Sequence, residues 1–140
     1  MAVDGKVEAL RTVGLFEGCT KRELQQIARL CTEFHFDEGF VLTTQGTPGQ
    51  ECFVIATGEA KVVIDGQQVA KVGAGDCVGE MSLLDGAPRS ATVTALTPVT
   101  VYALSTAEFR TLLGTSPTID RKIMVSLAHR LREVEAHRAH

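Results

Sequence analysis

The chain has 140 residues with a formal net charge of −3 at pH 7, and 44% of the residues are hydrophobic. This length suits a single domain with its own core, and the weak negative charge excludes a strongly basic surface for nucleic acid or anionic lipid. No run of about 18 apolar residues, as a membrane span requires, is present. The first ten residues include Asp4, Lys6 and Glu8, unlike a signal peptide. We therefore expect a cytoplasmic protein with no membrane partner.

The N-terminal segment, residues 1–32, is predicted to form two or three short helices that are broken at Gly14 and Gly18. Thr20 followed three residues later by Glu23 is the pattern of a capping box. Apolar residues then recur at helical spacing, namely Leu24, Ile27, Ala28 and Cys31. One face of this segment should therefore pack on a larger unit.

From residue 33 to 104 the pattern changes to short apolar runs separated by turn signals. Asp65 and Gly66 stand between two of these runs, and an Asp-Gly pair suits the tight turn of a β-hairpin. The runs recur about every ten residues without intervening helices, which predicts a mainly β fold. The expected architecture is an antiparallel jelly-roll (double-stranded β-helix) barrel with N-terminal helices and a C-terminal helix pair.

Helical spacing returns in residues 105–140. Ser105 and Glu108 form a second capping pattern, and Gly114 and Pro117 separate a short helix from the last one. The last helix carries an apolar stripe that we expect to face the core, made of Ile119, Ile123, Leu127 and Leu131. Two heptads with a and d positions at Met124, Leu127, Leu131 and Val134 give the alternative, a homodimer paired through this helix.

The segment from Gly79 to Val93 has the residues of an anion-binding loop. Gly79 lets the backbone approach a ligand closely, and a helical turn over residues 80–84 would point free N–H groups toward it. Arg89 supplies a planar guanidinium that matches phosphate oxygens. Taken singly, Glu80 is explained by the helix dipole and Arg89 by solvation. Their combination at this spacing favours a binding site.

This segment closely resembles the phosphate-binding cassette of cyclic nucleotide-binding domains, which occur in catabolite activator protein, cyclic-nucleotide-dependent protein kinases and cyclic-nucleotide-gated channels. Glycines also stand where that family places its strand-connecting turns, at Gly39, Gly46, Gly58, Gly75 and Gly79. The resemblance implies one domain over residues 1–140, with helices in 1–32, strands in 33–104, the cassette in 79–93 and helices in 105–140.

The resemblance also implies a ligand, cyclic AMP rather than cyclic GMP, and no metal or cofactor. Glu80 would accept a hydrogen bond from the ribose 2′-hydroxyl and Arg89 would pair with the phosphate oxygens. In the kinases a threonine after the arginine accompanies cyclic GMP and an alanine accompanies cyclic AMP, whereas Ser90 resembles bacterial sensors of cyclic AMP. The implied ligand-binding residues are Val78, Gly79, Glu80, Met81, Ser82, Arg89, Ser90, Ala91 and Arg130.

Apolar residues would line the slot for the purine, namely Val62, Val78, Met81 and Val93. In the family a residue of the last helix covers the base. Counting from Arg89, the position that covers the base in channel-like members corresponds to Arg130 of this chain. Its guanidinium would stack on the purine. The matching positions in catabolite-activator-like members, Val134 and Glu135, lack hydroxyls that would read adenine.

The implied mechanism is allosteric: the ligand favours the state in which the last helix covers the pocket, and the helix signals to a second copy or an effector protein. No DNA-reading element is recognised, so no nucleic-acid partner is expected. Enzymatic activity is not expected either, because Gly5-Lys6 lacks a P-loop and only His35 lies in the strand region, too few for a metal site. The four cysteines lack a Cys-x-x-Cys pair and are expected to be buried and reduced. The alternative is an interaction module that keeps the barrel without binding a nucleotide.

Overall fold

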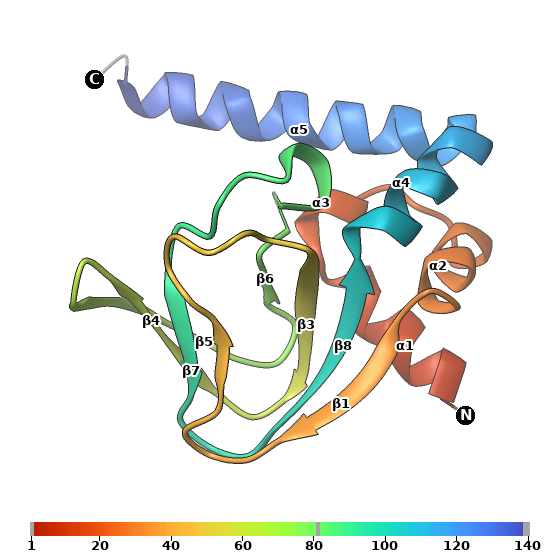
Figure 1. Cartoon of the computed structure of the whole chain (residues 1–140). Helices are drawn as coiled ribbons and strands as arrows, with labels where there is room; N and C mark the ends of the chain where they lie inside the picture. Colours follow the sequence, from red (N-terminus) through yellow and green to blue (C-terminus); the bar gives the residue numbers. More distant parts are fainter. Residues whose placement is uncertain (1, 81, 139–140) are drawn as a thin grey trace.

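The computed structural model describes residues 2–80 and 82–138, with the side chains of all but residues 2–4, 82, 85, 130 and 133–138. Two four-stranded antiparallel sheets face each other, with helices at one end (Figure 1). The first sheet has the order β1 (Thr32–Phe36), β8 (Val99–Ser105), β3 (Glu51–Thr57), β6 (Cys77–Val78). The second has the order β2 (Val41–Thr43), β7 (Thr92–Ala95), β4 (Ala60–Ile64), β5 (Gln67–Val72). The prediction of a mainly antiparallel β fold with flanking helices is confirmed.

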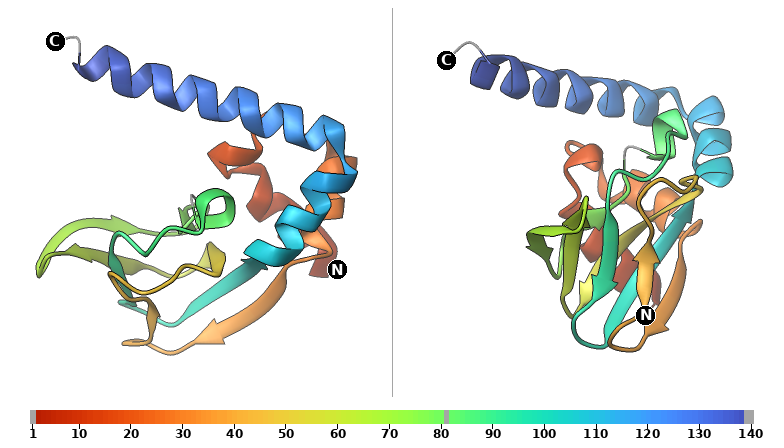
Figure 2. Two further views of the ribbon diagram at one scale, coloured as in Figure 1. Left: turned by 45° about the horizontal axis from the view of Figure 1, so that its top comes forward. Right: turned by 60° about the vertical axis from the view of Figure 1, so that its left-hand side comes forward.

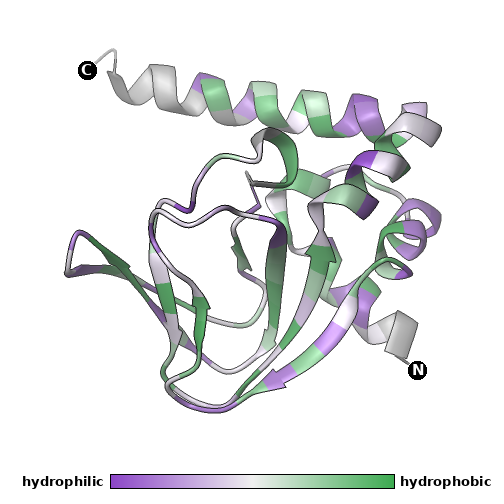
Figure 3. Cartoon of the chain, in the orientation of Figure 1, coloured by the Kyte–Doolittle hydropathy of each residue, from purple (hydrophilic) through white to green (hydrophobic). Residues whose placement is uncertain are grey.

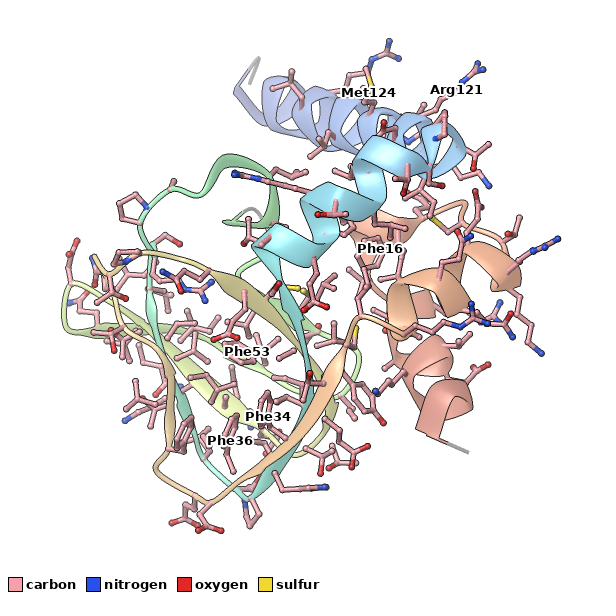
Figure 4. The ribbon with its side chains drawn as sticks, turned by 45° about the vertical axis from the view of Figure 1, so that its right-hand side comes forward. Phe16, Phe34, Phe36, Phe53, Arg121 and Met124 are labelled. Carbon is pink, nitrogen blue, oxygen red and sulfur yellow. The ribbon has the colours of Figure 1, made fainter. Side chains whose placement is uncertain are left out.

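The space between the two sheets is filled by apolar side chains from both. Phe53, Ile55 and Val101 of the first sheet meet Leu42 and Val93 of the second, and all five are buried. Along the edge, Phe34 and Phe36 stack with ring centroids 5.6 Å apart; Figure 4 labels both rings beside Phe53. Figure 3 shows the inner strands β3 and β8 as largely hydrophobic, whereas β1 alternates. Four of the five residues of β1 are exposed, because it is the edge strand of its sheet.

The N-terminal helices close one end of the sheets. They are α1 (Ala2–Arg11), the 3-10 turn η1 (Gly14–Phe16) and α2 (Lys21–Ala28). The predicted capping box is confirmed: Glu23 N–H donates to Thr20 Oγ1 at 3.2 Å, and Thr20 N–H donates to Glu23 Oε1 at 2.8 Å. The predicted apolar face is buried, with Leu24, Ile27, Ala28 and Cys31 all in the core.

The β4–β5 hairpin turns at Asp65 and Gly66, as predicted. Asp65 has a φ of +51° and Gly66 a φ of +82°, the left-handed conformations that this tight turn requires. Both hairpin strands pair along their length, and β4 also pairs with β7 from Ala60 to Val63. The tip of the hairpin therefore projects beyond the rest of its sheet (Figure 1).

Three further helices follow along the chain: α3 (Ser82–Asp85), α4 (Thr106–Thr115) and α5 (Pro117–Arg138). Ser105 Oγ accepts a hydrogen bond from Glu108 N–H at 3.1 Å, which confirms the second capping prediction. Figure 2 shows α5 running across the helical end of the molecule, above α3, in both views. Within the described chain, no helix combines the length and apolar character needed to cross a bilayer.

The first half of α5 packs on the helical end of the molecule, whereas the described side chains of residues 128–132 are exposed. Ile119 and Ile123 are fully buried, and Ser126 Oγ donates to the Gly14 carbonyl at 2.7 Å. Lys122 forms an ion pair with Glu23 of α2. The expectation that Leu131 faces the core is wrong, because its side chain is 60% exposed. The helix has by then run past η1 and α2, so this part of the stripe has no core to pack against (Figure 2).

The four cysteines are not joined in disulfide bonds, and of the four only Cys31 and Cys52 are buried, contrary to the expectation that all are. Cys19 and Cys77 are half-buried. Burial raises the pKa of Cys31 to about 12, so this thiol is inert at neutral pH. Among the described side chains, no three His, Cys, Asp or Glu residues gather as a metal site would need.

Candidate functional site

A pocket of about 530 Å³ lies between the second sheet and the segment that precedes β7. This volume lies within the range of small-molecule sites. Its walls come from β4, β5, β6, β7, the end of β2 and the 79–91 segment. The lining residues are Thr43, Val62, Val72, Cys77, Val78, Gly79, Glu80, Ala87, Pro88, Arg89, Ser90, Ala91 and Val93.

Arg89 is the cationic group of this pocket, and it is 9% exposed. Its Nη2 donates to the Glu51 carbonyl at 2.6 Å. Burial lowers the pKa of Arg89 from its ordinary value, while the Glu51 carboxylate opposes this shift. A guanidinium nevertheless stays protonated at neutral pH, so the pocket contains a fixed, partly desolvated positive charge.

Gly79 lies directly against that guanidinium. Its φ of +78° is left-handed, and a β-carbon at this position would lie 2.2 Å from Arg89 Nη1. A side chain at residue 79 would therefore push Arg89 aside, as well as strain the backbone. The sequence suggested that Gly79 lets the backbone approach a ligand closely. The structure adds a second reason for a glycine, because Gly79 also lies close to Arg89.

Glu80 lines the same pocket, half-buried, one residue after Gly79. The expected helical turn over residues 80–84 is displaced: α3 begins at Ser82, and Glu80 lies in the turn before it, where its carbonyl accepts a bond from Leu83 N–H at 3.1 Å. Leu83 is fully buried and fixes α3 to the core. Glu80 therefore lies just before the helix, among the residues that line the pocket.

The loop between β2 and β3 forms hydrogen bonds with the backbone of Arg89. Arg89 N–H donates to the Thr47 carbonyl and Gly46 N–H donates to the Arg89 carbonyl, both at 2.8 Å. Next to them, Thr43 Oγ1 donates to the Ala91 carbonyl at 3.0 Å. The backbone around Arg89 is thus held like a strand, although it lies in a loop.

Most of the predicted site residues meet in this one pocket: Val78, Gly79, Glu80, Arg89, Ser90 and Ala91. Met81 lies outside the described residues. Ser82 is the first residue of α3 and Arg130 belongs to α5, but their side chains lie outside the described part of the chain. The same holds for the side chains of Val134 and Glu135.

Val72 and Thr43 line the pocket but were not among the predicted ligand-binding residues. Val72 faces the pocket because β5 pairs with β4, and the hairpin prediction with Val62 already placed would have found it. Thr43 reaches the pocket through the pairing of β2 with β7, a long-range contact that no local pattern indicates. Together with Val62, Val78 and Val93, Val72 makes one wall of the pocket largely apolar.

The pocket combines three chemical features. Arg89 offers a guanidinium for an anion, Glu80 offers a carboxylate that accepts hydrogen bonds, and valines offer an apolar wall. Glu80 and Arg89 carry the charges among its lining residues. The arrangement suits a small molecule that carries an anionic group, a nearby hydroxyl and a flat apolar body.

Comparison with known proteins gives a family. A family model described as the cyclic nucleotide-binding domain matches residues 33–116, well over half of the chain. The matched region includes every residue that lines the pocket.

Three relatives illustrate the similarity. The chain is 26% identical over 130 residues to a CRP-like cAMP-activated global transcriptional regulator of Mycobacterium tuberculosis, covering 89% of this chain and 58% of the relative. It is 34% identical over 115 residues to a cAMP-dependent protein kinase regulatory subunit of Colletotrichum orbiculare, covering 81% of this chain and 29% of that subunit. The crystal structure of a cyclic nucleotide-binding domain from Methylobacillus flagellatus superposes with a TM-score of 0.80 at 30% identity, covering 96% of this chain and 79% of that one. The chain thus spans less than two thirds of the length of both curated relatives.

Proposed function

Because the chain belongs to the cyclic nucleotide-binding domain family, we propose that it is a regulatory module that binds a cyclic nucleotide in the pocket at Arg89. One observation carries the proposal: a single pocket brings the Arg89 guanidinium, the Glu80 carboxylate and four valines together. These groups match the cyclic phosphate, the ribose hydroxyl and the purine of one ligand.

In this proposal the cyclic phosphate lies against Arg89, Gly79 and Ser90. The Arg89 guanidinium, already shielded from water, would make charge-assisted hydrogen bonds that contribute about 1.5 to 3 kcal/mol. Glu80 would accept the 2′-hydroxyl of the ribose, and the base would lie along the wall of Val62, Val72, Val78 and Val93.

Cyclic AMP is the proposed ligand in preference to cyclic GMP. The names of the mycobacterial regulator and the fungal kinase subunit both refer to cAMP. Ser90 follows Arg89 where the kinase members that bind cyclic GMP have a threonine. Titration with both nucleotides measures the preference directly.

The proposed output is the C-terminal helix α5. Its first half is fixed by Ile119, Ile123 and Ser126, whereas Ala128, His129 and Leu131 in its second half are exposed. A ligand with higher affinity for the state in which this half covers the pocket would shift the population toward that state. The exposed Met124, Val125 and Leu131 would then contact a second copy or an effector protein. Arg130 is the proposed cover of the purine.

The finer architecture belongs to the same proposal. Residues 1–140 would act as one domain, and the two sheets of residues 33–104 would form the jelly-roll barrel typical of this family, with no catalytic activity and a cytoplasmic location.

Isothermal titration with cyclic AMP and cyclic GMP tests the function. Wild type should bind, and Arg89→Ala should weaken binding by roughly tenfold or more. Arg22→Ala is the matched control, because Arg22 is an exposed arginine on α2, which does not line the pocket. If wild type binds neither nucleotide, the proposal is overturned in favour of an interaction module that keeps the fold.

A further inference from the structure

Gln45 and Asp65 are joined by two hydrogen bonds across 20 residues of sequence. Gln45 Nε2 donates to Asp65 Oδ1, and Asp65 N–H donates to Gln45 Oε1, each at 2.9 Å. Both ends of the glutamine amide are thus used, which fixes its orientation. We call this pair the Gln45–Asp65 clip.

One end of the clip is the tip of the β4–β5 hairpin. Asp65 occupies the left-handed turn position, with a φ of +51°. The pairing of β4 with β7 stops at Val63, and residues 65–70 are exposed. Beyond Val63 the hairpin therefore has no neighbouring strand to hold it to its sheet, and the clip supplies a tertiary tie at that point.

The other end of the clip is the loop that supports Arg89. Gln45 N–H donates to Thr92 Oγ1 at 2.9 Å, and the next residue, Gly46, donates its N–H to the Arg89 carbonyl at 2.8 Å. The side chain of Gln45 thus holds the hairpin, while the backbone at residues 45 and 46 holds the segment from Arg89 to Thr92.

These two ends belong to two different segments that line the pocket, which we call its two walls. The hairpin supplies Val62 and Val72, which form part of the apolar wall. The supported segment supplies Arg89, Ser90 and Ala91, which bring a guanidinium and a hydroxyl to the other wall. A change in the tilt of the hairpin would change the gap between the two walls.

We propose that the Gln45–Asp65 clip sets this gap, so that Gln45 and Asp65 are positioning residues for a ligand that must touch both walls. They do not line the pocket themselves. The identity of the ligand rests on the proposed function. The mechanical coupling between the hairpin and the Arg89 segment does not, because it rests on the hydrogen bonds described above.

Three single variants and one double variant separate the clip from general stability. Gln45→Ala removes both hydrogen bonds. Asp65→Gly removes the carboxylate but keeps the left-handed turn, which glycine adopts without strain. Asp65→Asn keeps an oxygen that can accept the hydrogen bond from Gln45, and asparagine adopts the left-handed conformation of this turn readily. It therefore serves as the rescue variant.

The affinity for cyclic AMP is measured first. Gln45→Ala should weaken the affinity roughly three- to tenfold, and Asp65→Gly should weaken it somewhat less. The double variant should bind no more weakly than Gln45→Ala, because both changes remove the same clip. Asp65→Asn should keep an affinity within about twofold of wild type. The proposal would be overturned by any one of three results. Gln45→Ala could bind with wild-type affinity, the two single effects could multiply in the double variant, or Asp65→Asn could bind as weakly as Asp65→Gly.

Amide hydrogen exchange, measured without nucleotide, distinguishes failure of the clip from failure of the proposed function. Gln45→Ala and Asp65→Gly should speed exchange both in the hairpin, at residues 62–72, and in the segment 89–93, whereas Asp65→Asn should match wild type. If wild type binds neither nucleotide, only the proposed function fails, and this experiment still decides on the clip. Equal exchange at residues 89–93 in all four proteins would overturn it.

Discussion

Gly79 and Arg89 are packed so closely that no side chain fits between them. A β-carbon on Gly79 would lie 2.2 Å from Arg89 Nη1 and 3.3 Å from Cζ, and the φ of Gly79 is +78°. The position of the guanidinium thus depends on the absence of a side chain ten residues earlier.

Gly79→Ala should therefore impair nucleotide binding as severely as loss of the arginine, by roughly tenfold or more, because Arg89 must leave its place. Gly18→Ala is the control, since Gly18 has a similar φ of +84° but nothing within 4 Å of an added β-carbon. It should lose only about 1 kcal/mol of stability and keep its affinity. Titration and thermal unfolding of both variants check this. Wild-type affinity in Gly79→Ala would contradict it.

The Glu23–Lys122 ion pair should make stability depend on pH in acid. Burial by itself would raise the pKa of Glu23, but hydrogen bonds from Lys122, Thr20 and Thr118 outweigh it and lower the pKa from 4.5 to about 2. A carboxyl with a depressed pKa in the folded state stabilises the fold above its ordinary pKa, and this contribution is lost as the pH falls from 4.5 toward 2.

Glu23→Gln should lower the free energy of unfolding at pH 7 by about 1 to 3 kcal/mol, because Lys122 loses its charged partner. Urea denaturation between pH 2 and pH 7 should show the difference from wild type shrinking toward the acid end. Glu59→Gln is the control, since Glu59 and Lys71 are 3.4 Å apart with both side chains about half exposed; its effect should stay within about 1 kcal/mol. A difference that is constant over the whole pH range would contradict the prediction.

Leu83 should be the anchor of α3, because it is fully buried in a helix of four residues. Leu83→Ala should lower the free energy of unfolding by about 2 to 5 kcal/mol, through lost burial and the cavity left behind. Leu96→Ala, at a side chain that is 36% exposed, should have a much smaller effect. Denaturant titration compares the two. Similar losses in both variants would show that α3 is not anchored in this way.

The exposed apolar side chains of α5 provide a test of self-association. Met124 is 69% and Leu131 60% exposed, and Figure 4 shows Met124 directed away from the strands. If α5 pairs two copies, Met124→Glu and Leu131→Glu should each shift the protein toward monomer in analytical ultracentrifugation, because a charge would be buried in the interface. Val69→Glu, at a 55% exposed side chain on β5, should have no such effect. A wild type that remains monomeric at high concentration would remove the basis for this prediction.

Local features were the ones that could be predicted from the sequence. The Asp65-Gly66 hairpin and the caps at Thr20 and Ser105 depend on residues within four positions of one another, and all three are confirmed. The candidate anion-binding segment was also recognisable, because Gly79, Glu80 and Arg89 lie close together in the sequence.

Contacts between distant segments could not be predicted in the same way. Thr43 lines the pocket only because β2 pairs with β7, and the partner of Arg89 at the Glu51 carbonyl is 38 residues away. The prediction for Leu131 failed for a different reason. Helical periodicity predicts which residues share a face of α5, but it does not predict how far along the helix that face is covered, and Leu131 is exposed.

The hydrogen bond from Arg89 to the Glu51 carbonyl has a consequence for the thermodynamics of binding. A free arginine side chain loses rotamer entropy worth about 2 kcal/mol when it is immobilised. Here the Glu51 carbonyl and the close backbone of Gly79 restrict Arg89 already, so most of that entropy is lost when the chain folds. The guanidinium is thereby preorganised, and an anionic ligand at the proposed site would gain its electrostatic attraction with little ordering penalty on association.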